Sequence, residues 1–225
     1  PDSRLLHAGF RRNGRATAEQ GFDIDYYDLH WVRNADAVGS RDVWRGNLLG
    51  GGRDRDLIDR LRDYPTLKDF ATERGWDFGE GYIAGGRGLS GSVDHLIGKP
   101  LLPTEALTES GVNASLIETV PDQPIEAPRR ASIFTPPFIL IKKNEELHHG
   151  IWSKSYLAYK HRLVGFSADE KDLDRLVAIG EWLDREKMAL NAYIAATSFS
   201  LFGQRATAIL SADIYALPYP VRMSA

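Results

Sequence analysis

The stretch LNAYIAATSFSLFGQRATAILSADIYALPYP, residues 190–220, changes character several times along its length. Its first residues carry alanines and apolar side chains at helical spacing, so they indicate the end of a helix. Small and polar residues then predict a loop that contains Thr197, Ser198, Ser200 and Gly203. The apolar residues after this loop predict a short strand. Leu217-Pro218-Tyr219-Pro220 ends the segment, because proline continues neither a helix nor a central strand.

The residues before this stretch predict the helix that leads into it. Ser167-Ala-Asp-Glu170 has the form of a capping box, in which the serine and glutamate side chains satisfy the first backbone N–H groups. We therefore expect a helix that begins near Ala168, with a break near Asp184. Apolar residues that recur at helical spacing are expected to face a core. They are Leu173, Leu176, Val177 and Leu183.

Two shorter helices are expected nearer the N-terminus. Residues 54–64 place apolar side chains at helical spacing. The second helix follows Thr66, which has the position of an N-cap, and Asp69 stands three residues later as its capping-box partner. Gly75 is expected to end this helix, because glycine readily adopts the left-handed conformation found there.

The middle of the chain predicts strands and loops. Residues 132–142 and 151–166 are rich in aromatic and β-branched side chains, which favour strands. Strands and helices do not alternate as regular βαβ units, so the expected fold class is α/β in the mixed α+β sense. We expect an irregular mixed-sheet domain followed by a helical C-terminal part. Its glycine-rich first part spans residues 1–128, and residues 129–225 hold a basic, strand-rich segment and the C-terminal helices.

Composition narrows the class of protein. Apolar residues make up 43% and charged residues 26% of the 225 residues, as in ordinary soluble globular proteins. No apolar run approaches the ~20 residues of a membrane span, and the arginine-rich N-terminus lacks the apolar centre of a signal peptide. The absence of cysteine excludes disulfides, thiolate metal sites and a cysteine nucleophile. We expect a cytoplasmic location without membrane contact.

Charge is distributed unevenly although the net charge is only −3. Residues 129–163 carry seven Lys or Arg against two Glu, whereas residues 100–128 carry five acids and no base. Affinity for a polyanion depends on the local field rather than on net charge, so the basic stretch is a candidate surface for nucleic acid. A merely solvated charged face is the alternative.

The C-terminal stretch also resembles a known family. Thr197, Ser198, Ser200 and Gly203, followed by Leu217-Pro218-Tyr219-Pro220, resemble the closing segment of the target-recognition region in adenine-specific DNA methyltransferases of restriction-modification systems. That segment has the form Thr-Ser-x-Ser-x-x-Gly-x-x-Arg or a near variant, and here Arg205 stands one place early. Looser similarity extends over residues 42–49, 54–82, 134–166 and 169–220, in the order found in the family.

The resemblance implies a function. In this family a catalytic domain binds S-adenosylmethionine and extrudes an adenine, while the recognition region reads the DNA sequence. This chain is similar to the recognition region alone, so it is expected to have no catalytic residues, no cofactor site and no metal site of its own. Its implied partners are double-stranded DNA and a methyltransferase catalytic domain in the same or a partner chain.

Two groups of residues are expected to contact the DNA. Basic side chains would neutralise phosphates, while small and polar residues of the C-terminal loop would approach the grooves. The phosphate-binding candidates are Lys142, Lys143, Lys154, Lys160 and Arg162. The loop candidates are Ser198, Ser200, Gly203 and Arg205.

Three other patterns are weaker indicators of chemistry. Thr135-Pro136-Pro137-Phe138 resembles the catalytic tetrapeptide of amino-methyltransferases, but threonine lacks the amide or carboxylate that polarises the target amine, so the start of a strand is the favoured interpretation. The glycines of residues 79–85 lack the preceding strand and following helix of a cofactor loop, and are interpreted as structural or close to DNA. Glu145, Glu146 and the adjacent histidines His148 and His149 are interpreted as the tip of a hairpin rather than a metal site.

Two alternatives to the DNA-recognition function stay open. The chain could be a protein-interaction module of a defence or mobile-element operon that does not bind DNA. A small enzyme that uses residues 135–138 as its site is the least favoured alternative.

Overall fold

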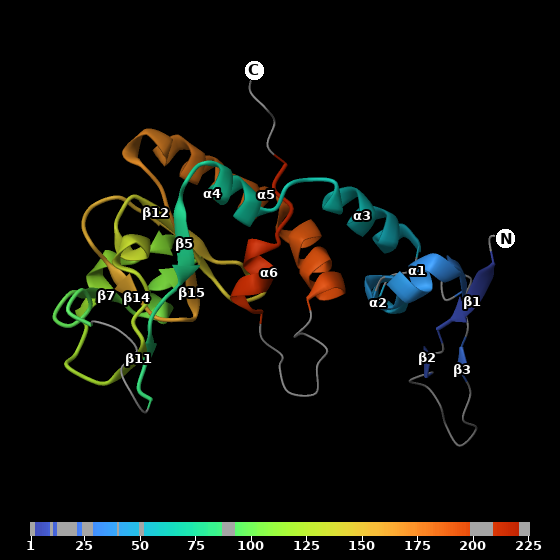
Figure 1. The fold of residues 1–225 in the computed structure, drawn as a ribbon, viewed down its shortest axis with the longest axis horizontal. Helices are drawn as coiled ribbons and strands as arrows, with labels where there is room; N and C mark the ends of the chain where they lie inside the picture. The colour runs from blue at the N-terminus through green and yellow to red at the C-terminus, as the bar shows by residue number, and fades with distance from the viewer. Residues whose placement is uncertain are drawn as a thin grey trace.

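The computed structural model describes residues 3–9, 11–12, 22–23, 29–39, 41–49, 52–86, 93–198 and 209–220. They form a mixed α+β fold, as expected, with several small sheets and one long helix, α5 (Leu173–Thr197), near the C-terminus (Figure 1). Even the 25-residue α5 is not apolar enough to serve as a membrane span, and the other described helices do not qualify either.

The first part of the chain consists of short hairpins and a run of helices. β1 (Arg4–Ala8) pairs with β4 (Leu29–Arg33), and β2 (Arg11–Arg12) pairs with β3 (Phe22–Asp23), both antiparallel. The helices that follow are α1 (Asn34–Gly39), α2 (Arg41–Leu49), α3 (Gly52–Arg62) and α4 (Leu67–Glu73). The amphipathic helix expected over residues 54–64 is therefore confirmed as α3.

A four-stranded antiparallel sheet forms the centre of the fold. Its strands lie in the order β13 (His149–Trp152), β12 (Phe138–Lys142), β15 (Leu163–Ser167) and β5 (Asp77–Glu80). The sheet takes strands from both sides of the boundary predicted between residues 128 and 129, and that boundary stays a prediction.

Smaller sheets surround the central one. β6 (Ile83–Ala84) pairs with β11 (Ile125–Ala127), and β8 (Leu107–Thr108) pairs with β9 (Gly111–Val112). In a third sheet, β7 (Pro100–Leu102) lies between β10 (Glu118–Thr119) and the parallel strand β14 (Ala158–Tyr159). Short 3-10 turns connect these strands: η2 (Thr104–Ala106), η3 (Ala114–Leu116) and η4 (Ala131–Phe134).

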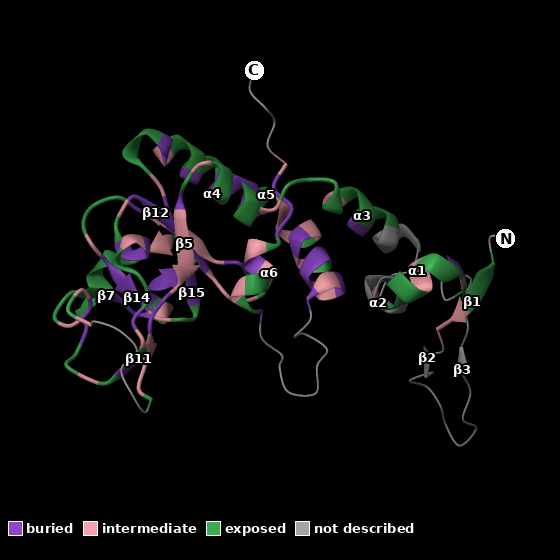
Figure 2. Cartoon of the chain, viewed as in Figure 1, coloured by how far each residue is buried: buried purple, intermediate pink, exposed green. Residues whose placement is uncertain are grey.

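Strand β12 explains how the core is divided. Side chains alternate between the two faces of a strand, and Ile139 and Ile141 contribute to one core with α4, α5 and α6 (Ser211–Tyr215). Phe138 and Leu140 contribute to a second core that contains the small sheets. The uninterrupted apolar run of β12 thus reflects burial on both faces, and Figure 2 shows buried residues concentrated around this sheet.

The strand begins later than expected. Residues 131–134 form the turn η4, so β12 starts only at Phe138. One or two further strands are expected over residues 151–166, and the structure has parts of three there, β13, β14 and β15. Residues 143–148 connect β12 and β13, so the hairpin tip predicted around Glu145, Glu146 and His148 is confirmed, while His149 is the first residue of β13.

Helix α4 begins and ends as expected. The Asp69 N–H donates to the Thr66 hydroxyl at 3.1 Å, and the Thr66 N–H donates to the Asp69 carboxylate at 3.0 Å. This reciprocal pair confirms the capping box. Gly75 has a φ of 69°, the left-handed conformation that ends a helix at little cost for glycine.

The Leu-Pro-Tyr-Pro segment packs against the start of α4. The Leu67 N–H donates to the Leu217 carbonyl at 2.8 Å, and the Tyr219 N–H donates to the Pro65 carbonyl at 2.9 Å. The Tyr219 ring makes edge-to-face contacts with Phe70 and Trp182, with ring centroids 4.9 and 5.0 Å apart. The segment therefore closes the core between α4 and α5.

The strand predicted before this segment is wrong for the residues that the structure describes. Ser211–Tyr215 forms the short helix α6 instead. Its first turn is stabilised by the Asp213 carboxylate, which accepts a hydrogen bond of 2.8 Å from the Leu210 N–H. Ile214 is buried in the core against α4 and α5, so tertiary packing favours the helical turn.

The predicted start of the long helix is also wrong. Ser167 is the last residue of β15, where it pairs with Phe138 and Asp77, and its hydroxyl donates to the Thr135 carbonyl. Its side chain therefore does not cap a helix. A 3-10 turn, η5 (Glu170–Asp172), follows, and α5 begins only at Leu173.

Two further expectations about α5 fail. The helix runs without a break at Asp184. Val177 is 41% exposed, because the buried stripe passes through Leu176, Ile179 and Leu183 instead. Leu176 and Leu183 face the core as expected.

The N-terminal helices α2 and α3 pack against the C-terminal half of α5. Ile58 of α3 forms a small buried cluster with Tyr193 and Ala196 of α5. The Arg45 guanidinium of α2 donates to the Ser198 carbonyl, directly after the last residue of α5. A cation is favourable at this end, where unpaired carbonyls accumulate.

Candidate nucleic-acid interface

The pairing of β15 brings part of the basic stretch together. Lys142 stands opposite Leu163 in the β12–β15 pair, and the Lys143 N–H donates to the Arg162 carbonyl at 3.1 Å. The turn before β15 is held by Tyr82, which forms a bridge with Lys160 and accepts a hydrogen bond of 3.0 Å from the His161 N–H. Four basic side chains, those of residues 142, 160, 161 and 162, are thereby placed near one another.

These four residues line a cleft of about 490 Å³. Its other wall comes from the acidic stretch, because β14 pairs in parallel with β7 and places Tyr159 opposite Leu102. That wall contains Leu101, Pro103, Thr104, Glu105 and Glu118. The Lys142 ammonium donates to the Leu107 carbonyl at 3.4 Å, and thus also spans the two stretches.

Lys143 lies next to this cleft but has a different environment. Its side chain is only 11% exposed and forms an ion pair with Glu80. Arg129 contacts the same carboxylate at 3.2 Å. Two cations therefore share Glu80, and the charge of Lys143 is largely neutralised within the fold.

The pKa of His161 depends on the charged side chains around the cleft. Its burial lowers its pKa from the ordinary value, and so do the nearby charges of Lys143, Arg162 and Arg129, whereas Glu80 acts in the opposite direction. Cations thus outweigh the carboxylate around this ring. An anionic ligand in the cleft would favour the protonated imidazole.

Other predicted contact residues lie elsewhere. Lys154 is placed over the Trp152 ring, 5.5 Å from its centroid, and does not line the cleft. Ser198 is 2% exposed, and its carbonyl accepts from Arg45, so it joins α2 to α5 in this structure. Ser200, Gly203 and Arg205 lie outside the described residues.

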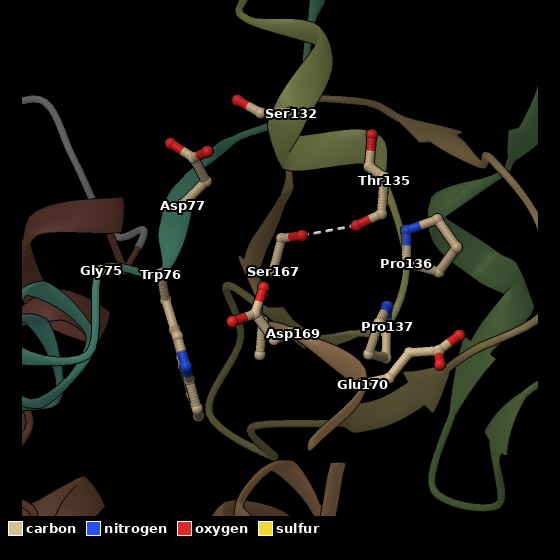
Figure 3. Close-up of a pocket in the computed structure, with 11 residues that line it drawn as sticks. Gly75, Trp76, Asp77, Ser132, Thr135, Pro136, Pro137, Ser167, Asp169 and Glu170 are labelled. Carbon is tan, nitrogen blue, oxygen red and sulfur yellow. Dashed lines mark hydrogen bonds between the residues drawn. The ribbon is translucent and has the colours of Figure 1, made fainter. Parts of the chain in front are cut away.

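Residues 135–137, which belong to the tetrapeptide that resembles a catalytic motif, line a second cleft and make hydrogen bonds within the fold. Figure 3 shows this cleft, of about 380 Å³, with the Ser167 hydroxyl directed at the Thr135 carbonyl. The Thr135 hydroxyl is engaged with the Ala131 carbonyl at 3.3 Å, and the Pro137 carbonyl accepts from the Ala168 N–H at 2.9 Å. The Thr135 hydroxyl and the Pro137 carbonyl thus already have partners within the fold, which favours the structural interpretation.

The glycine-rich stretch also has a packing explanation. Gly79 lies within β5, opposite Gly165 of β15. A Cβ at Gly81 would lie 2.1 Å from the Tyr159 carbonyl oxygen, so only glycine permits this approach. These glycines bring β5 against the strand that carries the basic turn.

The histidines of the β12–β13 hairpin do not form a metal site in the described part of the chain. No group of three or more His, Asp or Glu residues there is arranged to hold a metal ion. His149 instead lies 3.6 Å from the Asp184 carboxylate of α5.

Glu105 and Glu118 were not predicted as site residues. The sequence did offer one indication of them: the acidic stretch 100–128 and the basic stretch 129–163 have opposite charge, which favours contact between the two. Comparison of the sequence with models of protein families finds no match, and comparison with curated proteins finds no significant match.

Proposed function

We propose that this chain is the DNA target-recognition region of an adenine-specific DNA methyltransferase from a restriction-modification or related phage-defence system. It grips double-stranded DNA in the cytoplasm and presents the sequence to a catalytic domain that binds S-adenosylmethionine and lies outside these 225 residues. The chain itself carries out no methylation.

The observation that carries this proposal is the gathering of Lys142, Lys160 and Arg162 around His161 in one open cleft. Lys160 and Arg162 make no ion pair within the described part of the chain, so their charges are available to phosphates. Phosphate contacts of this kind supply most of the sequence-independent affinity of DNA-binding proteins and hold the duplex in register. Register is needed because base extrusion costs a few kcal/mol that protein–DNA contacts must offset.

The test replaces Lys160 and Arg162. We expect Lys160→Ala with Arg162→Ala to weaken binding to all duplex sequences and to reduce the slope of log affinity against log salt by about 2, or about 1 per lost contact. Fluorescence anisotropy with random-sequence duplexes at several salt concentrations measures this slope. The double variant Lys68→Ala with Lys187→Ala removes the same charge from α4 and α5 and is the matched control.

An unchanged salt slope in the cleft variant, with circular dichroism intact, would remove this cleft from a DNA interface. Lys143→Ala is expected to act differently, because it leaves Glu80 with one cation fewer inside the fold. Its main effect should be lower stability in urea melts rather than a smaller salt slope.

One observation favours the second candidate, a protein-interaction module. The β1–β4 hairpin presents Leu6 opposite Trp31, and these residues are 53% and 65% exposed. Exposed apolar surface of this kind is typical of protein contacts. The anisotropy experiment separates the two candidates, since the interaction module needs no DNA affinity.

A further inference from the structure

The cleft contains two carboxylates that a simple phosphate site does not need. Glu105 lies in η2 and Glu118 in β10, and both are exposed side chains on the wall opposite the cations. Neither forms an ion pair with Lys142, Lys160 or Arg162 within the residues that the structure describes. With His161 neutral, the cleft thus presents three cations and two anions.

Those carboxylates weaken the attraction of the cleft for phosphate, because like charges repel across a short distance. Their presence therefore favours a ligand that carries both an anionic group and hydrogen-bond donors. A nucleotide whose base has an exocyclic amino group meets both conditions.

Base chemistry supplies the discrimination. Cytosine N4 and adenine N6 are donors in the major groove, and a carboxylate accepts from them, whereas guanine O6 and thymine O4 are acceptors and would face the carboxylate unfavourably. A carboxylate therefore favours bases with an amino group over bases with an oxo group. A lysine or an arginine has the opposite preference, because it donates to the oxo group of guanine.

We propose that Glu105 and Glu118 read the exocyclic amino group of a cytosine or adenine in the DNA strand whose phosphates contact Lys160 and Arg162. This inference rests on the proposed function and names the specificity-determining residues of the same cleft. The carboxylates select the base, and the neighbouring cations hold the backbone from which that base is presented.

The experiment is selection from a random-sequence duplex library by the 225-residue chain, followed by sequencing of the bound duplexes. The variants are Glu105→Gln and Glu118→Gln, which keep the size of the side chain and remove its charge. Glu109→Gln and Asp122→Asn remove the same charge from the acidic stretch outside the cleft and are the matched controls. Circular dichroism verifies that each variant is folded.

We expect the wild-type chain to enrich a sequence that includes a position restricted to cytosine or adenine. Discrimination at that position should fall roughly 5- to 150-fold in Glu105→Gln or Glu118→Gln, the range of one good base contact, and should persist in the controls. Enrichment of the same sequence by wild type and by both cleft variants would overturn the inference and leave DNA recognition intact. Failure of the wild-type chain to bind any duplex would overturn the proposed function and this inference with it.

Discussion

Lys143 and Arg162 are joined by a backbone hydrogen bond just beyond the paired ends of β12 and β15, yet their side chains have different environments. The Lys143 side chain is nearly buried against Glu80, while Arg162 lines the cleft. A count of basic residues along the sequence treats them alike. The difference depends on Glu80, which lies 63 positions earlier in the chain and approaches only because β5 pairs with β15.

We expect His161 to make DNA binding at this cleft depend on pH. Its pKa lies below the ordinary value of 6.5 in the free protein, first through burial and then through Lys143. Under the proposed function, DNA phosphates would favour the protonated ring, so affinity should rise as pH falls from about 7.5 to about 5.5. Anisotropy measurements in a pH series should show this rise in the wild type and a flatter profile in His161→Gln.

The same residue predicts the sign of a stability change. As pH falls, His161 takes up a proton near pH 6.5 in the unfolded chain but only at a lower pH in the folded chain. His161 therefore favours the folded state above pH 6.5. This contribution is lost as pH falls from 6.5 toward the lower folded pKa.

His148→Gln changes a histidine outside the cleft and is the control for the binding measurement, in which it should leave the pH profile unchanged. A flat profile in the wild type would contradict the placement of phosphate near His161.

At the scale of elements, the Leu-Pro-Tyr-Pro segment is a structural closure. Tyr219 is 8% exposed and lies between Phe70 of α4 and Trp182 of α5. Its backbone also pairs with Pro65 before α4. The segment therefore joins two helices that the sequence separates by about a hundred residues.

Tyr219→Ala should lower the free energy of unfolding by about 3 kcal/mol, because it removes a buried aromatic ring and leaves a cavity. Tyr219→Phe keeps both ring contacts and should cost less than about 1 kcal/mol. Urea denaturation followed by tryptophan fluorescence measures both. Equal losses in the two variants would show that the hydroxyl, rather than the ring, stabilises the segment.

Local signals predicted local structure well and failed where distant strands compete. Thr66 and Asp69 cap α4 as expected, since both partners lie within one turn. Ser167 and Glu170 carry the same pattern, but the pairing of Ser167 with Phe138 and Asp77 keeps it in a strand. Local propensity and capping patterns do not indicate that strand pairing competes with helix capping at Ser167.

The candidate site was predicted only in part for a similar reason. Lys142, Lys160 and Arg162 were predicted from the charge of one stretch, and the structure brings them together. Glu105 and Glu118 join them through the parallel pairing of β14 with β7. Nothing in the period or composition of the sequence indicates that register.

At the scale of the whole molecule, the N-terminal hairpins and helices lie at one end and the central sheet at the other (Figure 1). The small cluster of Ile58, Tyr193 and Ala196 and the bond from Arg45 to Ser198 join α2 and α3 to α5. This contact buries far fewer side chains than the two cores around the sheet. The N-terminal part should therefore open more readily than the sheet.

Arg45→Ala should speed hydrogen exchange in α2 and α3 by roughly 10- to 150-fold, the effect of losing one charged hydrogen bond. Exchange in β12 should not change, because that strand lies in the central sheet. Arg60→Ala removes an exposed arginine of α3 and is the control. Equal acceleration in α2 and β12 would show that the molecule opens as one cooperative unit.

The position of β5 at the edge of the central sheet has a consequence for protein synthesis. Glu80 pairs with Val164, so the partner of β5 follows it by 84 residues. At a translation rate of about 5–20 residues per second, β5 waits roughly 4–17 s for β15 to leave the ribosome. During that time β12 emerges with its apolar run and can pair only with β13. We therefore expect nascent chains of this protein to pass through a stage in which an unpaired strand and an uncovered β-hairpin coexist, the kind of exposed intermediate for which chaperones exist.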